Sequence, residues 1–306
     1  MGDILHALPA VATLRRSFPQ ARITWMIEPR WRPLLEANPA IDEIAEFDRA
    51  GGLGGMWRSA RALRGQKFDL AIDFQGLIKS ASALRLAAGS AVRWGKQQPR
   101  EWPARLLYTK TAAVTDSLHI VEQHLELARA AGGQEPCREF PLPPGRPEGT
   151  LPAGRFVLAS PLAGWVAKQW PLEYYGELAR KLDEELSLPL VLNVSPGSEA
   201  AVSRVTGVAA VHVSGIAGLI DATRRAAAVV GVDSGPLHLA AALSKPGVAL
   251  FGPTDPARNG PYGGTLKVMR VAGAETTYRR DAGEPAASMR AISPGEVFEY
   301  LRSVLR

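Results

Sequence analysis

The chain has 306 residues, of which 46% are hydrophobic and 22% charged, a balance typical of a globular protein with room for two domains. No run approaches the roughly 20 apolar residues of a membrane-spanning helix, and the acidic Asp3 argues against the basic start of a signal peptide. A single cysteine, Cys137, excludes an internal disulfide framework and suits a reducing compartment.

The net charge is +6, and it is concentrated in one region. Between Arg49 and Lys110 there are twelve basic and three acidic residues, a local charge of +9. A positive field of this kind indicates an anionic partner, and nucleic acid, an anionic membrane surface and a phosphorylated substrate are all compatible with it. A solvated helix face would give the same pattern.

The first half alternates short apolar runs with helical patterns. The spacing of apolar residues predicts strands and helices in the order helix Ile4–Leu14, strand Arg22–Glu28, strand Phe68–Phe74, helix Lys79–Ala88 and helix Ser117–Ala131. The glycine-rich run Gly51–Gly55 follows no clear strand and is predicted to be a flexible loop. A Rossmann-like half normally opens with a strand, so we expect that its first strand is missing and that the sequence lacks about ten native residues.

The second half is a more regular series of strands and helices, which predicts a doubly wound parallel sheet. Its expected elements are strand Phe156–Ala159, helix Leu172–Leu186, strand Leu190–Val194, short helix Ser198–Val205, helix Ile216–Ala228, strand Val229–Asp233, helix Leu237–Leu243 and strand Val248–Phe251. A capping box at Ser293 and Glu296 predicts a last helix that reaches Arg306.

A stretch rich in glycine and proline, Gly132–Leu151, separates the two halves. We therefore expect domains at residues 1–140 and 154–290, joined by a linker at 141–153. The helix at residues 291–306 is expected to pack back on the first domain.

Several loops that follow predicted strands carry groups suited to anion binding. The loop Ser160–Pro171 has small residues that let backbone approach a phosphate, and Lys168 supplies a positive charge before a helix. Gly231–His238 combines glycines with Asp233 and Ser234 at the start of another helix. Two further loops, Phe251–Pro256 and Asp73–Ser80, are expected at strand ends, the latter carrying Lys79; turn chemistry alone would explain both.

Two single residues have competing interpretations. Asp3 is expected at the N-cap of the first helix, where a carboxylate accepts backbone N–H groups, and this capping role accounts for it without catalysis. Taken alone, His238 is interpreted first as a packed core histidine and only second as a binding residue. No D-x-D, H-E-x-x-H or paired C-x-x-C motif is present, so no metal ligands are predicted, and no cofactor.

Six motifs in the same order resemble the ADP-heptose:lipopolysaccharide heptosyltransferases over nearly the whole chain. They are Met1–Ala10, Ile72–Ala81, Arg100-Glu101 with His119–Glu122, Lys168–Pro171, Asp233–His238 and Phe251–Pro256. The likeness is greatest to the enzymes that add the first heptose.

The resemblance implies an α/β GT-B fold, in which two Rossmann-like domains with parallel sheets face each other across a cleft. The first domain would bind the acceptor and the second the nucleotide sugar. The reaction implied is the inverting, metal-independent transfer of heptose from ADP-heptose to a Kdo residue of the lipopolysaccharide inner core, with Asp3 as the general base. The implied donor-binding residues are Ser160, Ala163, Gly164, Lys168, Glu199, Ile216, Asp233, Ser234, Gly235, Pro236 and His238.

The basic region would then meet the anionic acceptor, Kdo-lipid A. The implied acceptor-binding residues are Arg58, Arg61, Arg64, Lys79 and Arg100. The implied partners are the donor, this acceptor and the inner-leaflet membrane surface, with no nucleic acid, and the implied location is cytoplasmic and peripheral to the membrane. This sequence departs from the family pattern at Ala163 and Gly164, where some relatives have hydroxyl residues that contact the phosphates. Backbone amides would have to make those contacts here.

Other functions remain open at this point. A second heptosyltransferase or a transferase of another sugar would share the motifs. A GT-B-like nucleotide-sugar epimerase would share the layout and the anion-binding loops. A non-catalytic nucleotide- or glycolipid-binding protein would bind the same ligands without turnover.

Overall fold

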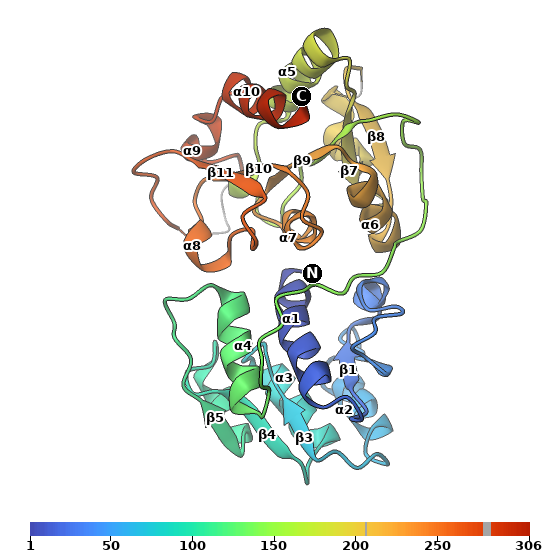
Figure 1. Cartoon of the computed structure of the whole chain (residues 1–306), viewed down its shortest axis with the longest axis vertical. Coiled ribbons are helices and arrows are strands. Elements are labelled where there is room, and N and C mark those ends of the chain that lie inside the picture. Colours follow the sequence, from blue (N-terminus) through green and yellow to red (C-terminus); the bar gives the residue numbers. More distant parts are fainter. Residues whose placement is uncertain (206, 278–282) are drawn as a thin grey trace. The chain divides into compact units, whose positions relative to one another are not determined.

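The structure is a computed structural model, and it describes residues 1–205, 207–277 and 283–306. The chain divides into two compact units between Pro143 and Pro144, a point inside the predicted linker (Figure 1). Each unit combines parallel strands with helices. No helix among the described residues has the length and apolar character needed to span a bilayer.

The first unit contains five strands in two parallel sheets, ordered β1-β2 and β3-β4-β5. The predicted strands and helices of this half are present with shifts of a few residues, and β2, β4, β5 and α2 are additional. Its elements are α1 (Gly2–Ser17), β1 (Thr24–Ile27), η1 (Pro29–Leu34), β2 (Glu43–Glu46), α2 (Gly52–Ala62), β3 (Leu70–Ile72), α3 (Ile78–Ala87), β4 (Val92–Lys96), η2 (Trp102–Leu107), β5 (Lys110–Ala112) and α4 (Ile120–Ala130).

Helix α1 is the most buried helix segment of this unit: every residue from 4 to 14 is buried. Ala10 of α1 packs with Ala128 of α4, and Ile72 of β3 and Phe74 after it cover the same cluster. A helix that is apolar on most of its circumference is stable only when neighbours cover it on several sides. The first turn, which carries Asp3, therefore extends from a well-anchored helix.

Histidines fasten α4 to α1. Nδ1 of His124 lies 3.1 Å from the carbonyl oxygen of His6, and the rings of His6 and His119 meet edge to face at 5.7 Å. Burial lowers the pKa of His124 to about 3, so this imidazole is neutral at physiological pH. His119 also accepts a hydrogen bond from the Val121 amide at the N-terminus of α4.

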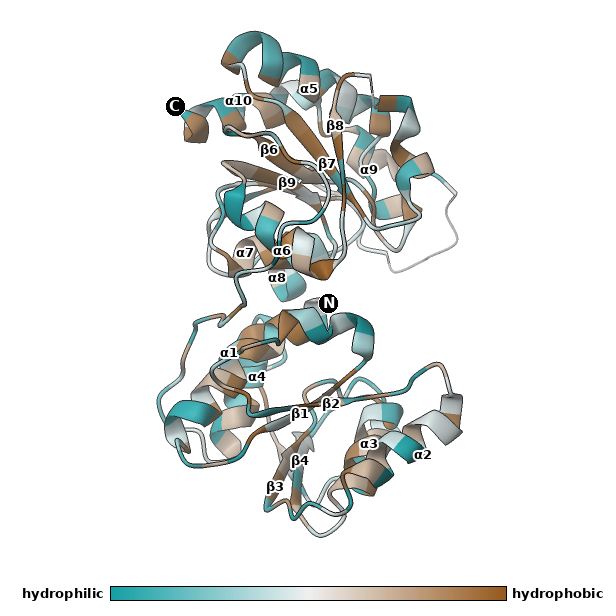
Figure 2. Cartoon of the chain, turned by 90° about the vertical axis from the view of Figure 1, so that its right-hand side faces the viewer, coloured by the Kyte–Doolittle hydropathy of each residue, from teal (hydrophilic) through white to brown (hydrophobic). Residues whose placement is uncertain are grey.

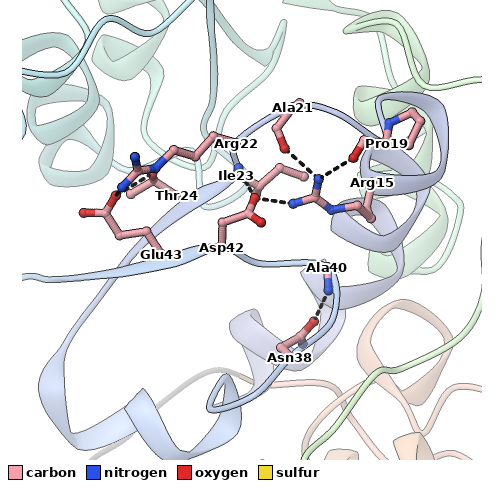
Figure 3. Close-up of polar contacts among 10 residues, drawn as sticks. All are labelled: Arg15, Pro19, Ala21, Arg22, Ile23, Thr24, Asn38, Ala40, Asp42 and Glu43. Carbon is pink, nitrogen blue, oxygen red and sulfur yellow. Dashed lines mark hydrogen bonds and ion pairs between the residues drawn. The ribbon is translucent and has the colours of Figure 1, made fainter.

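The C-terminal end of α1 is tied to the first sheet by Arg15 (Figure 3). Its guanidinium donates to the carbonyl oxygens of Pro19 and Ala21 and forms an ion pair with Asp42. Asp42 also accepts the Ile23 amide at 2.7 Å. These bonds fix the turn between α1 and β1, and with it the direction of α1.

The glycine-rich run does not form the predicted flexible loop, because α2 begins at Gly52. The side chain of Asp48 accepts the Gly51 amide at 2.9 Å. A Cβ atom at Gly55 would lie 2.3 Å from the carbonyl oxygen of Asp48. Glycine therefore serves here to let the first turn of a helix approach the preceding loop.

The second unit is built on one six-stranded sheet with the order β11-β10-β9-β6-β7-β8, in which every neighbouring pair is parallel. Figure 2 shows its central strands as hydrophobic and much of α5 as hydrophilic. The elements are β6 (Val157–Ser160), η3 (Val166–Lys168), α5 (Leu172–Leu186), β7 (Leu190–Val194), η4 (Glu199–Val205), β8 (Ala210–Val213), α6 (Ile216–Arg225), β9 (Ala228–Val232), α7 (Gly235–Ala242), β10 (Gly247–Phe251), α8 (Pro256–Asn259), β11 (Leu266–Arg270), α9 (Ala287–Arg290) and α10 (Pro294–Leu305).

The doubly wound sheet predicted for this half is confirmed, and α5 and β7 have the predicted bounds. The short helix expected at Ser198–Val205 is instead the 3-10 helix η4. Strand order reverses between β6 and β9: the chain builds outward from β6 to β8, then returns beside β6 and builds outward to β11. Such a reversal is the usual ligand site of an open parallel sheet.

The last helix, α10, has the predicted capping box, in which Ser293 accepts the Glu296 amide and Glu296 accepts the Ser293 amide. Its buried side chains Val297, Phe298 and Leu301 belong to the core of the second unit, and α10 packs on α5, β9 and β10. The expectation that it packs on the first domain is therefore corrected. The apolar face of α10 is needed to close the second unit's own sheet.

Candidate active site: two groups of polar side chains

The carboxyl ends of β6 and β9 lie side by side in the second unit, because Ser160 pairs with Gly231 in the sheet. The loop after β6 leads to Lys168, and the residue after β9 is Asp233. Lys168 Nζ lies 2.6 Å from Asp233 Oδ2, although 65 positions separate the two residues. The strand reversal thus brings two of the predicted loops together.

Asp233 is the centre of this group. Besides Lys168, His238 Nε2 lies 3.7 Å from its Oδ1. Burial would raise the pKa of Asp233, but the contacts with His238 and Lys168 outweigh burial and hold it at about 2. Lys168 Nζ also lies 4.3 Å from the centre of the Trp165 ring, a cation–π contact that fixes its position.

The low pKa of Asp233 makes the stability of the second unit depend on pH. Because the pKa is about 2 in the folded chain and 3.8 ordinarily, its contribution is complete above pH 4 and is lost as the pH falls towards 2. The full contribution is about 2 kcal/mol. Urea unfolding between pH 5 and 2 measures the free energy of unfolding of wild type and Asp233→Asn. The difference between the two values is expected to decrease as the pH falls. Asp183→Asn, at an exposed acid of α5, should show no such decrease.

The N-terminus of α7 adds donors beside this pair. Ser234 is the N-cap residue, and the amides of Gly235 and Leu237 point out of the helix start, whereas Pro236 between them has no N–H to donate. Ser234 Oγ is buried and has no hydrogen-bond partner among the described residues. A buried hydroxyl at a helix N-terminus, next to a lysine, suits an anionic group such as a phosphate.

The remaining predicted donor-binding residues are placed at other points of the same sheet edge. Ser160 is buried at the end of β6, Ala163 is half-buried and Gly164 is exposed in the following loop. Glu199 opens η4 after β7, and Ile216 opens α6 after β8. Relative to the Lys168–Asp233 pair at the reversal, Glu199 lies one strand farther along the sheet, and Ile216 lies two strands farther.

In the first unit, Asp3 and Arg100 form an exposed pair. Arg100 Nη1 lies 3.7 Å from Asp3 Oδ2, and about half of each side chain is exposed. Asp3 is not the N-cap residue as predicted: Met1 is, and Asp3 lies in the first turn of α1 without a capping hydrogen bond. Its carboxylate is thus available to solvent, beside a cation and at the positive end of a buried helix.

The loop after β3 is organised by a buried acid, Asp73. Its carboxylate accepts hydrogen bonds from the Gln75 amide at 2.9 Å, the Ser80 hydroxyl at 2.8 Å and the Tyr108 hydroxyl at 2.7 Å. Burial raises the pKa of Asp73, and these hydrogen bonds oppose the rise. Lys79 was predicted in a strand-end loop, but it is the second residue of α3. The helix begins at Ile78, where Ser80 and the backbone of Leu77 cap its first turn.

Gly76 connects this loop to Arg100. It has φ +69°, and a Cβ atom there would lie 3.0 Å from the Arg100 amide nitrogen. The Gly76 carbonyl accepts the amide of Glu101 at 2.9 Å, and the Glu101 side chain accepts the amide of Ile78 at 2.7 Å. The backbone that carries Arg100 is therefore held against the start of α3.

Replacing Gly76 with alanine is expected to destabilise the protein by about 1–2 kcal/mol, because alanine is strained at positive φ and its methyl group would press on the backbone at Arg100. The matched control is Gly65→Ala, at a glycine without positive φ where the added Cβ meets nothing within 4 Å. Urea unfolding of both variants measures the difference. Equal midpoints for the two variants would contradict the tight packing at Gly76.

Glu28 is a functional candidate that sequence reasoning missed. It follows β1 and lies near three cations: Arg30 at 3.1 Å, Arg49 at 3.3 Å and Lys79 at 3.7 Å. Its side chain is mostly buried, with 18% exposed, whereas the three cations are 39–60% exposed. The sequence offered one signal for this site, an acid at the end of an apolar strand. The cations gave no signal, because they lie in separate segments of the chain.

The other predicted acceptor-binding residues have local partners. Arg58 pairs with Asp48 at 2.9 Å, Arg61 lies over the ring of Trp57 at 4.8 Å, and Arg64 donates to the carbonyl oxygen of Leu86 at 3.2 Å. They lie on α2 and directly after it. Of the five residues proposed for the acceptor, Lys79 lies 3.7 Å from Glu28 and Arg100 lies 3.7 Å from Asp3.

The described residues 1–205, 207–277 and 283–306 include most of the chain's histidine, cysteine, aspartate and glutamate side chains. No group of three or more histidine, cysteine, aspartate or glutamate side chains converges there as a metal site. Cys137 is buried, and its amide donates to Thr13 Oγ1 at 2.8 Å.

Several known proteins similar to this chain are heptosyltransferases. Lipopolysaccharide heptosyltransferase 1 of Escherichia coli O18:K1:H7 is 30% identical over 298 residues, covering 90% of each chain. The structure of E. coli heptosyltransferase WaaC with ADP superposes with a TM-score of 0.80 at 25% identity, covering 99% of this chain and 96% of that one. E. coli ADP-heptose lps heptosyltransferase II gives a TM-score of 0.81 at 26% identity, with 99% and 95% covered.

The α/β fold of this chain is accordingly the GT-B fold of these enzymes. Residues 56–287 match the family described as Glycosyltransferase family 9 (heptosyltransferase). That match spans the Glu101 loop, the Lys168–Asp233 pair and the start of α7, and it covers well over half of the sequence. The chain therefore belongs to glycosyltransferase family 9, the heptosyltransferases.

Proposed function

We propose that this glycosyltransferase transfers heptose from ADP-heptose to a Kdo residue of the lipopolysaccharide inner core. The observation that carries the proposal is the Lys168–Asp233 pair at the strand reversal, next to the buried Ser234 hydroxyl, for which the described residues provide no hydrogen-bond partner. This arrangement suits the diphosphate of a nucleotide sugar. Glu199, beyond the neighbouring strand, is proposed to bind the ribose.

The proposed reaction is a single displacement that inverts the anomeric centre. Asp3 accepts the proton of the acceptor hydroxyl while that oxygen forms a bond to the anomeric carbon of heptose. The bond from this carbon to the β-phosphate oxygen breaks, and ADP leaves with the electron pair. Lys168 and the first amides of α7 stabilise the charge that develops on ADP, a role in which a fixed cation can serve.

The first unit is proposed to hold the acceptor. Kdo carries a carboxylate and lipid A carries phosphates, and the cations of this unit match them in charge. Arg100 lies 3.7 Å from the proposed base, Asp3, and Lys79 lies 3.7 Å from Glu28. Such an acceptor is embedded in a bilayer, so the enzyme would work in the cytoplasm, peripherally at the inner leaflet.

Donor identity is tested by calorimetric titration of ADP-heptose, ADP-mannose and UDP-GlcNAc in the presence of EDTA. Tight binding of ADP-heptose with weak or no binding of the other two is expected. Preference for another donor, or binding that requires added Mg²⁺, would overturn the proposal. Release of an altered nucleotide sugar in the absence of acceptor would identify an epimerase instead.

The transfer step is tested separately with two acceptors, because the likeness to heptosyltransferase II is as high as that to WaaC. Kdo-lipid A lacking heptose and the same glycolipid already carrying one heptose are compared at equal concentration. Transfer to the first alone is expected. Transfer to the second alone would assign the chain to the next step of the core.

A further inference from the structure

The short helix η2 presents two large apolar side chains to solvent. Trp102 is 65% exposed and Leu106 is 70% exposed. Ala104, which lies between them in the sequence of η2, is buried with Ala81 of α3 and Tyr108. The helix is thus anchored through Ala104, while these two apolar side chains remain exposed.

A third exposed apolar residue adjoins them. Ile78, at the start of α3, is 44% exposed, and its amide donates to the side chain of Glu101, the residue before Trp102. The surface formed by Ile78, Trp102 and Leu106 is called the η2 surface below. Its members come from two segments that follow the parallel strands β3 and β4, so it lies at the carboxyl edge of that sheet.

Cations flank the η2 surface. Lys79 follows Ile78, Arg100 precedes Glu101 and Trp102, and Arg105 lies between Trp102 and Leu106 along η2, with its guanidinium donating to the carbonyl oxygen of Gln97. Three acids lie near these groups: Glu101 accepts the Ile78 amide, Glu28 lies 3.7 Å from Lys79, and Asp3 lies 3.7 Å from Arg100. Tryptophan and leucine beside arginine and lysine are the residues by which proteins settle at the headgroup level of anionic bilayers.

We propose that the η2 surface docks on an anionic lipid bilayer. The inference rests on the proposed function and specifies how its glycolipid acceptor is approached: Arg100 belongs both to the margin of this surface and to the Asp3 pair. A second copy of the chain is a poorer occupant, because joining two such surfaces would bring their cations together. Insertion of the apolar side chains and attraction of the cations would act together on a bilayer.

The test uses the full chain and sedimentation with vesicles of phosphatidylcholine, with and without phosphatidylglycerol. Wild type is expected to bind the anionic vesicles and to bind them more weakly at high salt. The double variant Trp102→Ser/Leu106→Ser is expected to bind about tenfold to a hundredfold more weakly, because two large apolar side chains no longer leave water. The control Val208→Ser/Val304→Ser removes two exposed apolar side chains of the second unit and should change binding less than twofold.

Calorimetry with ADP-heptose is run on the same samples. It distinguishes failure of the docking surface from failure of the proposed donor. Equal vesicle binding by wild type and the Trp102/Leu106 variant would overturn the docking surface, as would binding by neither. Wild type that self-associates through these residues would also overturn it, in favour of a second copy. Vesicle binding that depends on Trp102 and Leu106, without ADP-heptose binding, would leave the surface standing and refute the proposed donor.

Discussion

Replacing Asp3 with asparagine is expected to lower kcat by about 10²- to 10⁴-fold, while ADP-heptose binding stays within about twofold. The asparagine has nearly the same size but cannot take the acceptor proton at neutral pH. Donor binding should be kept because the proposed donor groups belong to the second unit. Single-turnover transfer measures the rate, and calorimetry measures the binding.

The matched control for Asp3 is Glu139→Gln, which also removes one exposed carboxylate paired with an arginine of α1, here Arg16 at 2.8 Å. Its turnover should equal that of wild type. If Asp3→Asn retained wild-type turnover, another group would have to be the base. If both variants lost activity equally, general charge loss would be the cause and the special role of Asp3 would be refuted.

Replacing Lys168 with methionine is expected to lower kcat/KM by about 10²- to 10³-fold and to weaken ADP binding. Methionine keeps an unbranched apolar stem that can pack on Trp165, but it cannot neutralise the leaving diphosphate. It also leaves the largely buried carboxylate of Asp233 without its ion-pair partner, so that the site would repel an anion. Steady-state kinetics and calorimetry with ADP follow both effects.

Lys181→Met is the control for Lys168, since Lys181 is another lysine of the second unit over an aromatic ring, Phe298, at 5.7 Å. It should leave kinetics unchanged. A thermal unfolding scan of both variants separates loss of structure from loss of function. Full activity in a folded Lys168→Met protein would show that the lysine only stabilises the loop.

Local patterns in the sequence were sufficient for the second unit's regular elements. The apolar run Leu190–Val194 and the periodic helix Leu172–Leu186 appear as predicted because each segment's own residues specify it. Short strands with little burial, such as β8 and β11, were not found because they lack a long apolar run. Their place depends on neighbours that pair with them.

The candidate site shows the same division between local and distant information. Lys168 and Asp233 were each predicted as anion-binding residues from their loops, but their 2.6 Å contact depends on strand order, which no local pattern reveals. Glu28 was missed because its partners come from three separate segments. The α2 start was missed because the run of glycines concealed a helix that Asp48 stabilises.

The position of Glu28 has a consequence for the entropy of binding. Lysine and arginine side chains lose rotamer freedom when a ligand orders them, at a cost of up to about 2 kcal/mol each. Glu28 holds Arg30, Arg49 and Lys79 in one place before any ligand arrives. Part of this ordering is therefore completed during folding, and an anion that binds the three cations meets a preorganised group.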